Sequence, residues 1–594
     1  MTVTTTPPTS VPLGTYLAIR LAQLGLKHVF GVPGDFNLTL LDHIEASPDL
    51  TWIGFCNELN AAYAADGYAR VKGTPMTLIT TYGVGELSAL NGIAGAFAEN
   101  VPVIHIVGTT GRPIQEAGLL IHHVPPPKGH APLPANHRIY PETSKPFSVA
   151  QEYLLDPRLA PSQIDSAISA AYKQALPVYI YVPVDMVAQP LPKHLLDTPL
   201  DLAIESGLES EQEEDSLVDE ILTTLYAAKS PVILADTLSE RFRLREEITN
   251  LVKKAQIPSF STLLGKGLVD ETSPYFAGVY NGELSHTGIA EAVHASDCVL
   301  NLGPLLSDSN TGGFTRKIKS ENAIILHPLY VQVGDTPRRD GISFVPIVKK
   351  LVARLDPAKL QHSPLPQVTL RHDRPSPTPI SLASLIHNVS TQFLRPGDVV
   401  IPEVGTVQFA SPDFIFPADT RIITQVFYSS IGFSLPAAVG AAFAQRELNP
   451  ANPSRVVLLE GDGSAQMTIQ ELGTMVRNKL NIAVFLLNNS GYSIERAIWG
   501  PQQGYNDICP DWKWTQLLSA FGGSEAKSCL STRIETKKEE EEFFTNGIIN
   551  KSDLPRLIEV ILHPNNYPWR LDDQVKFMGA QNIAMYKEYS AKHD

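Results

Sequence analysis

The apolar residues of this chain follow two alternating patterns. Short, continuous apolar runs rich in β-branched residues are typical of buried strands, and longer segments between them carry apolar residues at helical spacing. In the first third of the chain, runs at 28–30, 77–80 and 103–107 are separated by Ala-rich helical patterns. Strands that alternate with helices in this way predict βαβ units and a mainly parallel sheet.

The clearest βαβ unit lies between residues 456 and 489. The run at 456–459 predicts a strand, Gly461-Asp462-Gly463-Ser464 predicts a tight turn, and the run at 482–487 predicts a second strand that ends at Asn488-Asn489. A helix is predicted from Ala465, with an apolar stripe at Met467, Ile469, Leu472, Met475 and Val476. Because parallel strands place their carboxyl ends at one edge of a sheet, Asp462 and Asn489 are expected to lie close together.

This edge has the side chains of a site for a metal ion and a diphosphate. Glycine N–H groups at a helix N-terminus favour phosphate oxygens. Asp462 offers a carboxylate oxygen, Asn489 an amide oxygen and Gly491 a backbone carbonyl, which are ligands that Mg²⁺ prefers. A lone GDGS is most often only a turn capped by its serine. An Asn pair 24 residues further on is more specific, because two elements must then converge on one ion.

Length and composition set the domain number and exclude several classes of protein. A chain of 594 residues is too long for one core and predicts about three domains, which we place at 1–195, 196–366 and 367–594. An acidic segment at 193–215 and a Pro-rich segment at 356–381 are interpreted as the connectors. A net charge of −15 without Lys/Arg runs argues against nucleic-acid binding.

The same composition predicts a cytoplasmic protein without a membrane partner. The four cysteines have no CxxC spacing, which fits a reducing compartment. No signal-peptide pattern is evident, and the most apolar window, 432–444, is too short to span a bilayer.

The GDG…NN pattern resembles the thiamine diphosphate signature of the pyruvate decarboxylase family, and matching stretches run from Gly31 to about Glu559. The resemblance implies a fungal-type, thiamine diphosphate- and Mg²⁺-dependent decarboxylase of a small 2-oxo acid, with pyruvate as the first candidate substrate. It implies three α/β domains, of which the first binds the pyrimidine half of the cofactor and the third binds the diphosphate. It also implies a homodimer or homotetramer with each site formed between two subunits.

Five residues would carry the chemistry if the resemblance holds. Glu58 follows a plausible N-cap, Asn57, and by itself would be a surface acid that matches the helix dipole. The resemblance makes it the partner of the aminopyrimidine ring, in a setting of small residues that suggests burial. Asp35 in a glycine-rich loop, the pair His122-His123 and Glu495 would otherwise be turn, loop and helix-start residues. The resemblance makes them the groups that move protons around the substrate.

Further residues are assigned to the cofactor by resemblance alone. Ile431 would form the wedge beneath thiamine, the Ser429 carbonyl would accept a hydrogen bond from its amino group, and Ile494 with Ile498 would form an apolar wall. The remaining expected contacts are Thr406, Gly461, Gly463, Ser464 and Tyr492, with Asp462, Asn489 and Gly491 around the metal.

The chain departs from the family pattern in ways that keep other hypotheses open. Pro125-Pro126-Pro127 stands where a mobile glycine-containing loop is usual, and Lys128, Gly129 and His130 follow. This favours a catalytically weak regulatory paralogue. Ser309 and Gln408 favour an aromatic or branched-chain 2-oxo acid, since pyruvate-preferring members often have Phe at the first position and small-substrate members a smaller residue at the second. A ligase of the acetolactate synthase type is less favoured, because Glu495 and the His pair belong to the decarboxylase pattern.

Overall fold

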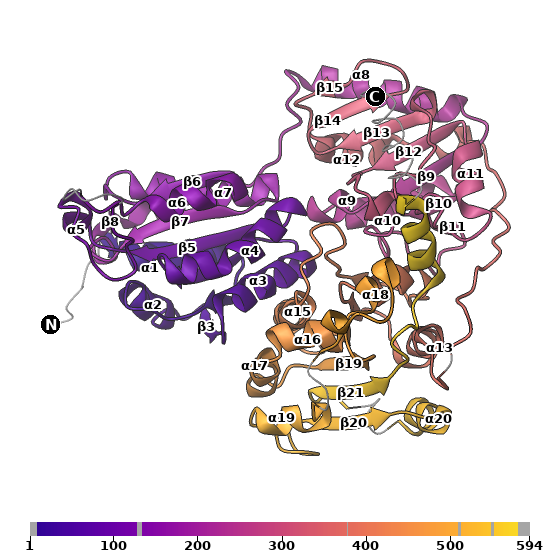
Figure 1. Cartoon of the computed structure of the whole chain (residues 1–594). Coiled ribbons are helices and arrows are strands. Elements are labelled where there is room, and N and C mark those ends of the chain that lie inside the picture. Colours follow the sequence, from indigo (N-terminus) through magenta and orange to yellow (C-terminus); the bar gives the residue numbers. More distant parts are fainter. Residues whose placement is uncertain (1–8, 128–133, 377, 509–511, 548–551, 580–594) are drawn as a thin grey trace, which may run out of the picture. The chain divides into compact units, whose positions relative to one another are not determined.

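The computed structural model describes residues 9–127, 134–376, 378–508, 512–547 and 552–579. The chain divides into two compact units, Met1–Ala203 with Pro436–Pro453 and Ile204–Leu435 with Ser454–Asp594. Both are built on sheets of mainly parallel strands flanked by helices (Figure 1), which confirms the predicted fold class. The division into three domains at the predicted boundaries stays a prediction.

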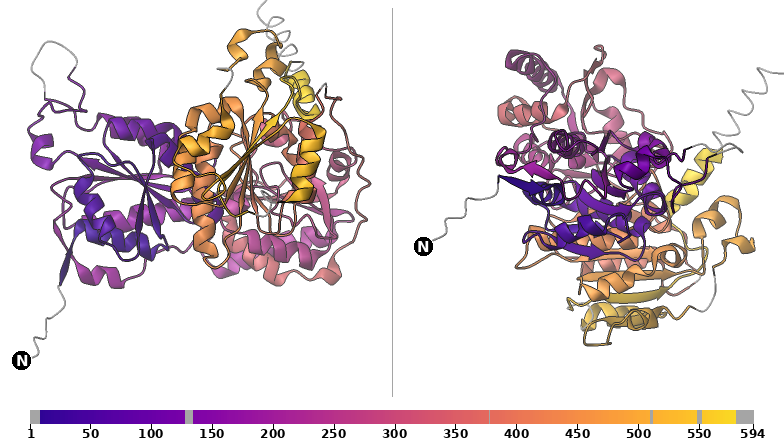
Figure 2. Two further views of the ribbon diagram at one scale, coloured as in Figure 1. Left: turned by 90° about the horizontal axis from the view of Figure 1, so that it is seen from below. Right: turned by 90° about the vertical axis from the view of Figure 1, so that its left-hand side faces the viewer.

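The main sheet of unit 1 has the strand order β3-β2-β4-β5-β7-β6, and every neighbouring pair is parallel. All residues of β4 and β7 are buried, as expected for strands covered by helices on both faces (Figures 1 and 2). The strands are β2 His28–Gly31, β3 Thr51–Gly54, β4 Met76–Thr81, β5 Val103–Thr109, β6 Ala150–Tyr153 and β7 Val178–Pro183. The longer helices are α1 Leu13–Gln23, α2 Leu38–Glu45, α3 Glu58–Lys72, α4 Val84–Ala98 and α7 Ala160–Gln174.

Helix α3 begins and ends where the sequence predicts. The Asn57 side chain accepts a hydrogen bond from the Leu59 N–H, and Gly73 ends the helix in the left-handed conformation at φ 74°. Glu58 is therefore in the first turn. Two glycines allow α3 to pack against α15, Ser434–Leu448: a Cβ on Gly67 would lie 2.3 Å from the Ala437 carbonyl oxygen. A Cβ on Gly440 would lie 1.8 Å from a backbone oxygen of α3.

A buried carboxylate fixes the far end of this helix pair. Glu447 accepts hydrogen bonds from the Tyr68 hydroxyl at 2.7 Å and pairs with His28 at 2.6 Å and with Lys72. Because these partners come from β2 and α3, Glu447 joins the last turn of α15 to both elements.

Unit 2 contains two sheets. The first has the order β11-β10-β9-β12-β13-β14-β15 and is parallel as far as β13, after which two antiparallel strands follow. Its strands are β9 Pro231–Ala235, β10 Ser259–Ser261, β11 Phe276–Val279, β12 Cys298–Leu302, β13 Ala323–His327, β14 Tyr330–Val333 and β15 Arg339–Asp340. Its main helices are α8 Glu211–Ala227, α10 Arg245–Ala255, α11 Ile289–Ala295 and α12 Phe344–Arg354.

The second sheet of unit 2 has the order β17-β16-β18-β19-β21-β20 and is parallel throughout. Pro402 pairs with Leu459, and Gly461 pairs with Leu487, so β16, β18 and β19 end at the same edge. The strands are β16 Val399–Pro402, β17 Arg421–Ile422, β18 Val456–Gly461, β19 Ile482–Asn488, β20 Leu530–Ile534 and β21 Arg556–Ile561. The helices used below are α14 Thr406–Ala410, α16 Asp462–Thr468, α17 Glu471–Arg477, α18 Ser493–Trp499 and α20 Lys537–Asn546.

Two predicted elements were wrong in detail. The helix predicted from Ala465 begins at Asp462 and is interrupted between α16 and α17, so Met467 is 51% exposed and does not belong to the buried stripe. The acidic segment predicted as a connector is partly helical. Helix α8 begins within it at Glu211, and the Ser210 side chain caps the N-terminus of this helix. None of the helices in the described ranges is long and apolar enough to cross a membrane.

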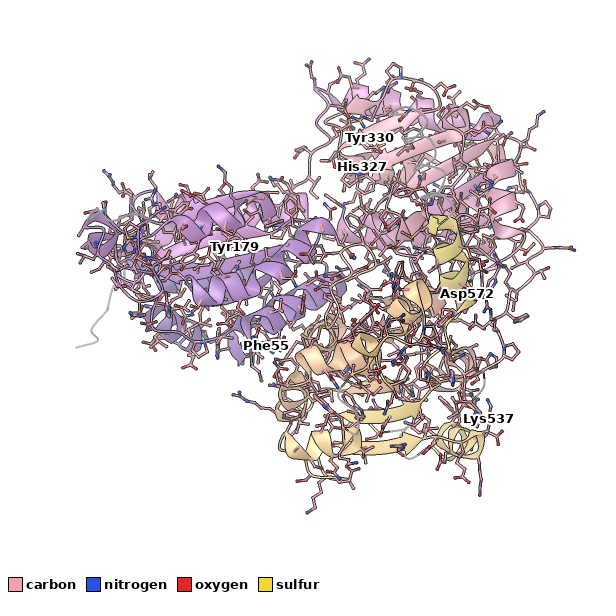
Figure 3. All side chains as sticks on the ribbon, viewed as in Figure 1. Phe55, Tyr179, His327, Tyr330, Lys537 and Asp572 are labelled. Atoms are coloured by element: carbon pink, nitrogen blue, oxygen red, sulfur yellow. The ribbon has the colours of Figure 1, made fainter. Side chains whose placement is uncertain are left out.

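Unit 1 also buries a carboxyl group that the sequence analysis did not single out. Glu86, in the first turn of α4, is 1% exposed and accepts hydrogen bonds from the Tyr181 hydroxyl at 3.0 Å and from Ser144 at 3.5 Å. Tyr181 stacks on Tyr179, which is labelled in Figure 3, so the carboxyl group lies among aromatic rings. Burial raises the pKa of Glu86 to about 7.

This raised pKa predicts a pH-dependent effect of Glu86→Gln. Unfolded Glu titrates near ~4.3, so the contribution of Glu86 to the free energy of unfolding falls as pH rises from about 4.3 to about 7. Gln keeps the hydrogen-bond acceptor without the charge. We expect Glu86→Gln to raise the free energy of unfolding by about 1 kcal/mol at pH 5 and by about 3–4 kcal/mol at pH 8, with a correspondingly larger rise in Tm at pH 8. Thermal unfolding across this pH range measures it, with exposed Glu142→Gln as the control; a pH-independent difference would contradict the prediction.

Candidate active site

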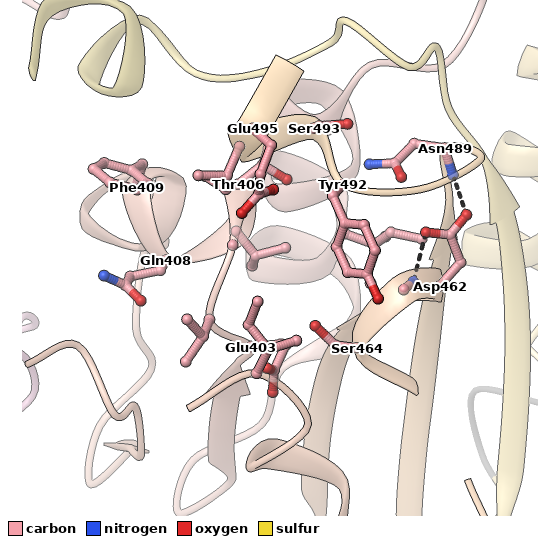
Figure 4. A pocket seen from close by; sticks show the side chains of 18 of the residues that line it. Glu403, Thr406, Gln408, Phe409, Asp462, Ser464, Asn489, Tyr492, Ser493 and Glu495 are labelled. Carbon is pink, nitrogen blue, oxygen red and sulfur yellow. Dashed lines mark hydrogen bonds between the residues drawn. The ribbon is translucent and has the colours of Figure 1, made fainter. Parts of the chain in front are cut away.

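The carboxylate of Asp462 lies at the point where the loops after β18 and β19 meet. Its side chain is fully buried and accepts backbone N–H bonds from Gly463 at 2.8 Å, Asn489 at 3.1 Å and Gly491 at 3.2 Å (Figure 4). Burial raises its pKa to about 6, although these hydrogen bonds act in the opposite direction. The predicted convergence of the two loops is therefore present.

Three oxygen atoms face one another at this point. The amide oxygen of Asn489 lies 2.8 Å from the Gly491 carbonyl oxygen and 3.1 Å from a carboxylate oxygen of Asp462, while the amide nitrogen faces the Ser493 hydroxyl at 3.1 Å. Oxygen ligands at right angles around Mg²⁺ are separated by about 2.9 Å, given Mg–O distances of about 2.1 Å. The donor set therefore fits a Mg²⁺ ion. Without a cation, the amide is expected to turn over and donate to both oxygens.

A cavity of about 260 Å³ opens beside these oxygens (Figure 4). It is lined by all of the predicted cofactor-binding residues that lie in unit 2, namely Thr406, Ser429, Ile431, Gly461, Asp462, Gly463, Ser464, Asn489, Gly491, Tyr492 and Ile494. Glu495 also lines it, as do Ser309 and Gln408, the two positions expected to influence substrate size. Ile498, the second residue of the predicted apolar wall, is 56% exposed in the single chain and is not among the residues that line this cavity, so its role stays a prediction.

Unit 1 brings Asp35, His122 and His123 into one cluster. The His122 Nε2 lies 2.5 Å from an Asp35 carboxylate oxygen, and the two imidazole centroids are 4.8 Å apart. The rings can meet because the backbone is not helical here: His123 has a φ of 70°. The Tyr140 hydroxyl donates to the His123 carbonyl, and the Tyr82 hydroxyl donates to the His122 carbonyl at 3.1 Å.

Glu58 is half-buried at the start of α3, less enclosed than the sequence analysis expected. A Cβ on Gly85 would lie 3.0 Å from its Oε1 atom, so the glycine leaves space for the carboxylate. The triple-proline segment after His123 is described as far as Pro127 and forms no helix or strand there. Lys128, Gly129 and His130 lie outside the described residues.

Comparison with known proteins places this geometry in a family. Three family models match: the thiamine pyrophosphate enzyme N-terminal TPP-binding domain at residues 12–129, the central domain at 218–355 and the C-terminal TPP-binding domain at 403–560. A pyruvate decarboxylase of Candida glabrata is 41% identical, over 96% of this chain and 99% of its own length. Pyruvate decarboxylase isozyme 1 of Saccharomyces cerevisiae is 40% identical over the same shares.

The chain belongs to the thiamine diphosphate-dependent pyruvate decarboxylase family. Membership confirms the predicted resemblance, the carboxy-lyase class and thiamine diphosphate as the cofactor. A further relative, the transaminated amino acid decarboxylase of Saccharomyces cerevisiae, is 38% identical over 96% of this chain and 95% of its own length. Family members named for different activities are therefore similar to this chain to nearly the same degree.

The loop that contains Ile431 is held in place by Glu403, to which the sequence analysis did not assign a role. Its carboxylate is 1% exposed and accepts backbone N–H bonds from Gly432 at 3.1 Å and from Ser434 at 2.9 Å. The Thr468 hydroxyl donates to the Gly432 carbonyl at 2.9 Å. Ile431 precedes Gly432, so these bonds fix the residue expected to support thiamine. Burial raises the pKa of Glu403 to about 7.

The sequence contained one signal for this role of Glu403, which is a charged residue directly after the apolar run of β16. Glu460, near the end of β18, carries the same signal, and its neighbour Leu459 pairs with the residue before Glu403. Its side chain is also fully buried, but neither carboxylate oxygen has a hydrogen-bond partner among the described residues. Burial raises its pKa well above the ordinary value. Only the three-dimensional structure distinguishes the two glutamates.

This difference predicts that the same substitution weakens cofactor binding at Glu403 and leaves it unchanged at Glu460. In Glu403→Gln one acceptor becomes an NH₂ group that faces a backbone N–H, which costs about 1–3 kcal/mol and loosens the Ile431 loop. We expect the Kd for thiamine diphosphate, titrated by intrinsic fluorescence at fixed Mg²⁺, to rise about tenfold or more. Glu460→Gln is the matched control and should bind the cofactor normally, since it removes no hydrogen bond. Normal binding by Glu403→Gln would show that the carboxylate does not hold the loop.

Proposed function

We propose that the chain catalyses the non-oxidative decarboxylation of a 2-oxo acid to an aldehyde and CO₂, with thiamine diphosphate held through Mg²⁺. The observation that carries the proposal is the convergence of the oxygens of Asp462, Asn489 and Gly491 at one end of a cavity that Glu495 also lines. Those three residues would hold the ion. Family membership supplies the reaction class.

The bound cofactor would supply a thiazolium ring that accepts the electron pair released when CO₂ leaves. The chain's own residues position the groups and move the protons. The backbone N–H groups around Gly461–Ser464 would favour the diphosphate oxygens, and Ile431 would support the thiazolium ring. Glu58 would hold a proton on the aminopyrimidine side. The apolar lining, including Ile494 and Leu487, excludes water from a step in which charge is dispersed.

Proton transfer at the substrate is assigned to Glu495 and to the cluster in unit 1. Glu495 lies in the first turn of α18 and lines the cavity. The short contact between Asp35 and His122 orients the imidazole of His122. His123 lies beside it, and together these groups would protonate the product carbon and release the aldehyde.

Pyruvate is the first candidate substrate, because it is named in the activity of several similar proteins. A larger 2-oxo acid is the second candidate. It is supported by the relative named a transaminated amino acid decarboxylase and by the position of Ser309 and Gln408 in the cavity wall. A weakly active regulatory paralogue would bind the cofactor without turnover. Cys298 and Cys529 are buried without a disulfide bond, which supports the cytoplasmic location that we propose.

The first experiment measures CO₂ release from pyruvate, phenylpyruvate and a branched 2-oxo acid, with thiamine diphosphate and Mg²⁺ present or removed by EDTA. We expect release that depends on both cofactors. Glu495→Gln should lower kcat by about 10²–10⁴, the usual size of a general acid–base contribution, while exposed Glu541→Gln in α20 should not. Cofactor binding without release from any of the three acids would support the regulatory hypothesis instead.

We also propose that the chain acts as a homodimer or homotetramer in which Glu58 of one copy and Asp462 of another serve the same site. Complementation tests this proposal. Glu58→Gln and Asp462→Asn should each be inactive alone. In a dimer formed from equal amounts of the two, half of the molecules are mixed and each has one intact site. The expected activity is therefore about one quarter of wild type. No recovery on mixing, with mixed oligomers verified by two affinity tags, would place both residues in one chain's site.

A further inference from the structure

The cluster of Asp35, His122 and His123 in unit 1 has the composition of a binding site for a transition-metal ion. Each residue offers one ligand atom, and these three atoms all lie within 4.8 Å of one another. The His122 Nε2 atom lies 2.5 Å from an Asp35 carboxylate oxygen. Two imidazoles and one carboxylate are a common ligand set for Zn²⁺ and related ions. The cluster therefore has the groups to bind a metal as well as to move protons.

The two imidazole rings are held in position by their surroundings. The hydroxyls of Tyr82 and Tyr140 donate to the backbone carbonyls of this adjacent histidine pair. The His122 ring stacks on Phe36, with the centroids 5.0 Å apart and the planes at 27°. The His123 ring meets the Tyr82 ring edge-on. Because these contacts already limit the conformations of the pair, less conformational freedom is lost when both rings bind one ion.

The side chains that carry the ligand atoms can still adjust to an ion. The side chain of His122 is 58% exposed and that of Asp35 is 52% exposed. Ligand atoms in a tetrahedron around Zn²⁺ are about 3.3 Å apart, given metal–ligand distances of about 2.0–2.1 Å. We expect rotation of the two exposed side chains to bring the three atoms to this spacing. The exposure also leaves a fourth position open to water.

The type of ligand distinguishes this cluster from the proposed Mg²⁺ site. The oxygens of Asp462, Asn489 and Gly491 suit a hard cation such as Mg²⁺. Imidazole nitrogen instead suits Zn²⁺, Co²⁺ and neighbouring transition metals. The cluster lies in unit 1 and the oxygen ligands lie in unit 2, so they share no ligand within one chain.

We propose that Asp35, His122 and His123 form a second metal site, which binds Zn²⁺ or a similar transition-metal ion, and that this ion inhibits the enzyme. The ion binds to the lone pairs of the imidazole nitrogens, which are then no longer available to carry protons. The inhibition rests on the proposed decarboxylation, whereas the binding does not. The two parts are therefore tested separately.

The binding test titrates Co²⁺ into the full chain without an affinity tag, loaded with thiamine diphosphate and excess Mg²⁺. Four-coordinate Co²⁺ with nitrogen ligands absorbs visible light much more strongly than six-coordinate Co²⁺ with oxygen ligands, so the spectrum distinguishes the two sites. We expect one strongly absorbing Co²⁺ ion for each chain. Zn²⁺ should displace it, because Zn²⁺ binds to such ligands more tightly.

Matched variants locate the bound ion. His122→Gln should weaken Co²⁺ binding about 100-fold or more, since loss of a group that only hydrogen-bonds a metal ligand already costs about 10–100-fold. His123→Gln should have the same effect, and exposed His194→Gln should have none. Asp462→Asn should keep the strong absorption although it removes a proposed Mg²⁺ ligand. Without added metal, the Tm of His122→Gln should equal that of the wild type.

The inhibition test measures CO₂ release at saturating Mg²⁺ while Zn²⁺ is added, with the 2-oxo acid that the enzyme uses best. We expect half-maximal inhibition at the Zn²⁺ concentration that displaces half of the bound Co²⁺. A chelator that binds Zn²⁺ far more tightly than Mg²⁺ should restore the rate. His194→Gln should be inhibited in the same way as the wild type.

Each other outcome overturns a stated part of the proposal. Absence of the strong Co²⁺ absorption in the wild type would overturn the metal site and leave the proposed function intact. Absorption that is kept in His122→Gln and lost in Asp462→Asn would place the ion at the Mg²⁺ site. Binding without any change in the rate would overturn the inhibition alone. No CO₂ from any 2-oxo acid would overturn the proposed function and the inhibition, while the Co²⁺ spectrum would still decide the metal site.

Discussion

The candidate site depends on one buried carboxylate that accepts hydrogen bonds from two loops. Asp462 begins the helix after β18, yet two of its backbone partners, Asn489 and Gly491, follow β19. A buried anion is unfavourable unless it is compensated, and here three N–H groups compensate only part of the cost, because the pKa is still raised to about 6. A divalent cation at the same point would supply the missing compensation. The register of β18 against β19 determines where such a cation would lie.

The parts of this arrangement that could be predicted from the sequence are those determined by local pattern. The runs that became β18 and β19 are buried on both faces, so their apolar composition indicated them directly. Parallel pairing then placed Asp462 and Asn489 at one edge. The helix between them was harder to predict, because the interruption between α16 and α17 changes which residues share one face. Met467 fits an apolar stripe only if the helix is continuous.

Other features depend on contacts between residues far apart in the chain, and no local pattern encodes them. His122 and His123 would face different directions on a helix. They meet because His123 adopts a left-handed conformation, and hydroxyl groups of two distant tyrosines bind the carbonyls of the pair. Glu58 was expected to be more enclosed than it is, since small neighbouring residues indicate close packing of the helix but not of its first turn. The helix α8 was missed for a different reason: its Ser210-x-x-Glu213 start signal was hidden in an acidic segment.

The buried polar side chains around the cavity differ in whether the protein supplies their hydrogen-bond partners. Glu403 uses both oxygens to hold the loop of Ile431, and Asp462 uses both to hold the metal-site loops. Hydrogen bonds within the protein therefore account for the presence of these two buried carboxylates. Gln408 differs, because its amide oxygen is buried and none of the described residues donates a hydrogen bond to it. Glu460, whose two carboxylate oxygens also have no partner among the described residues, shows that such a group does not by itself identify a ligand contact.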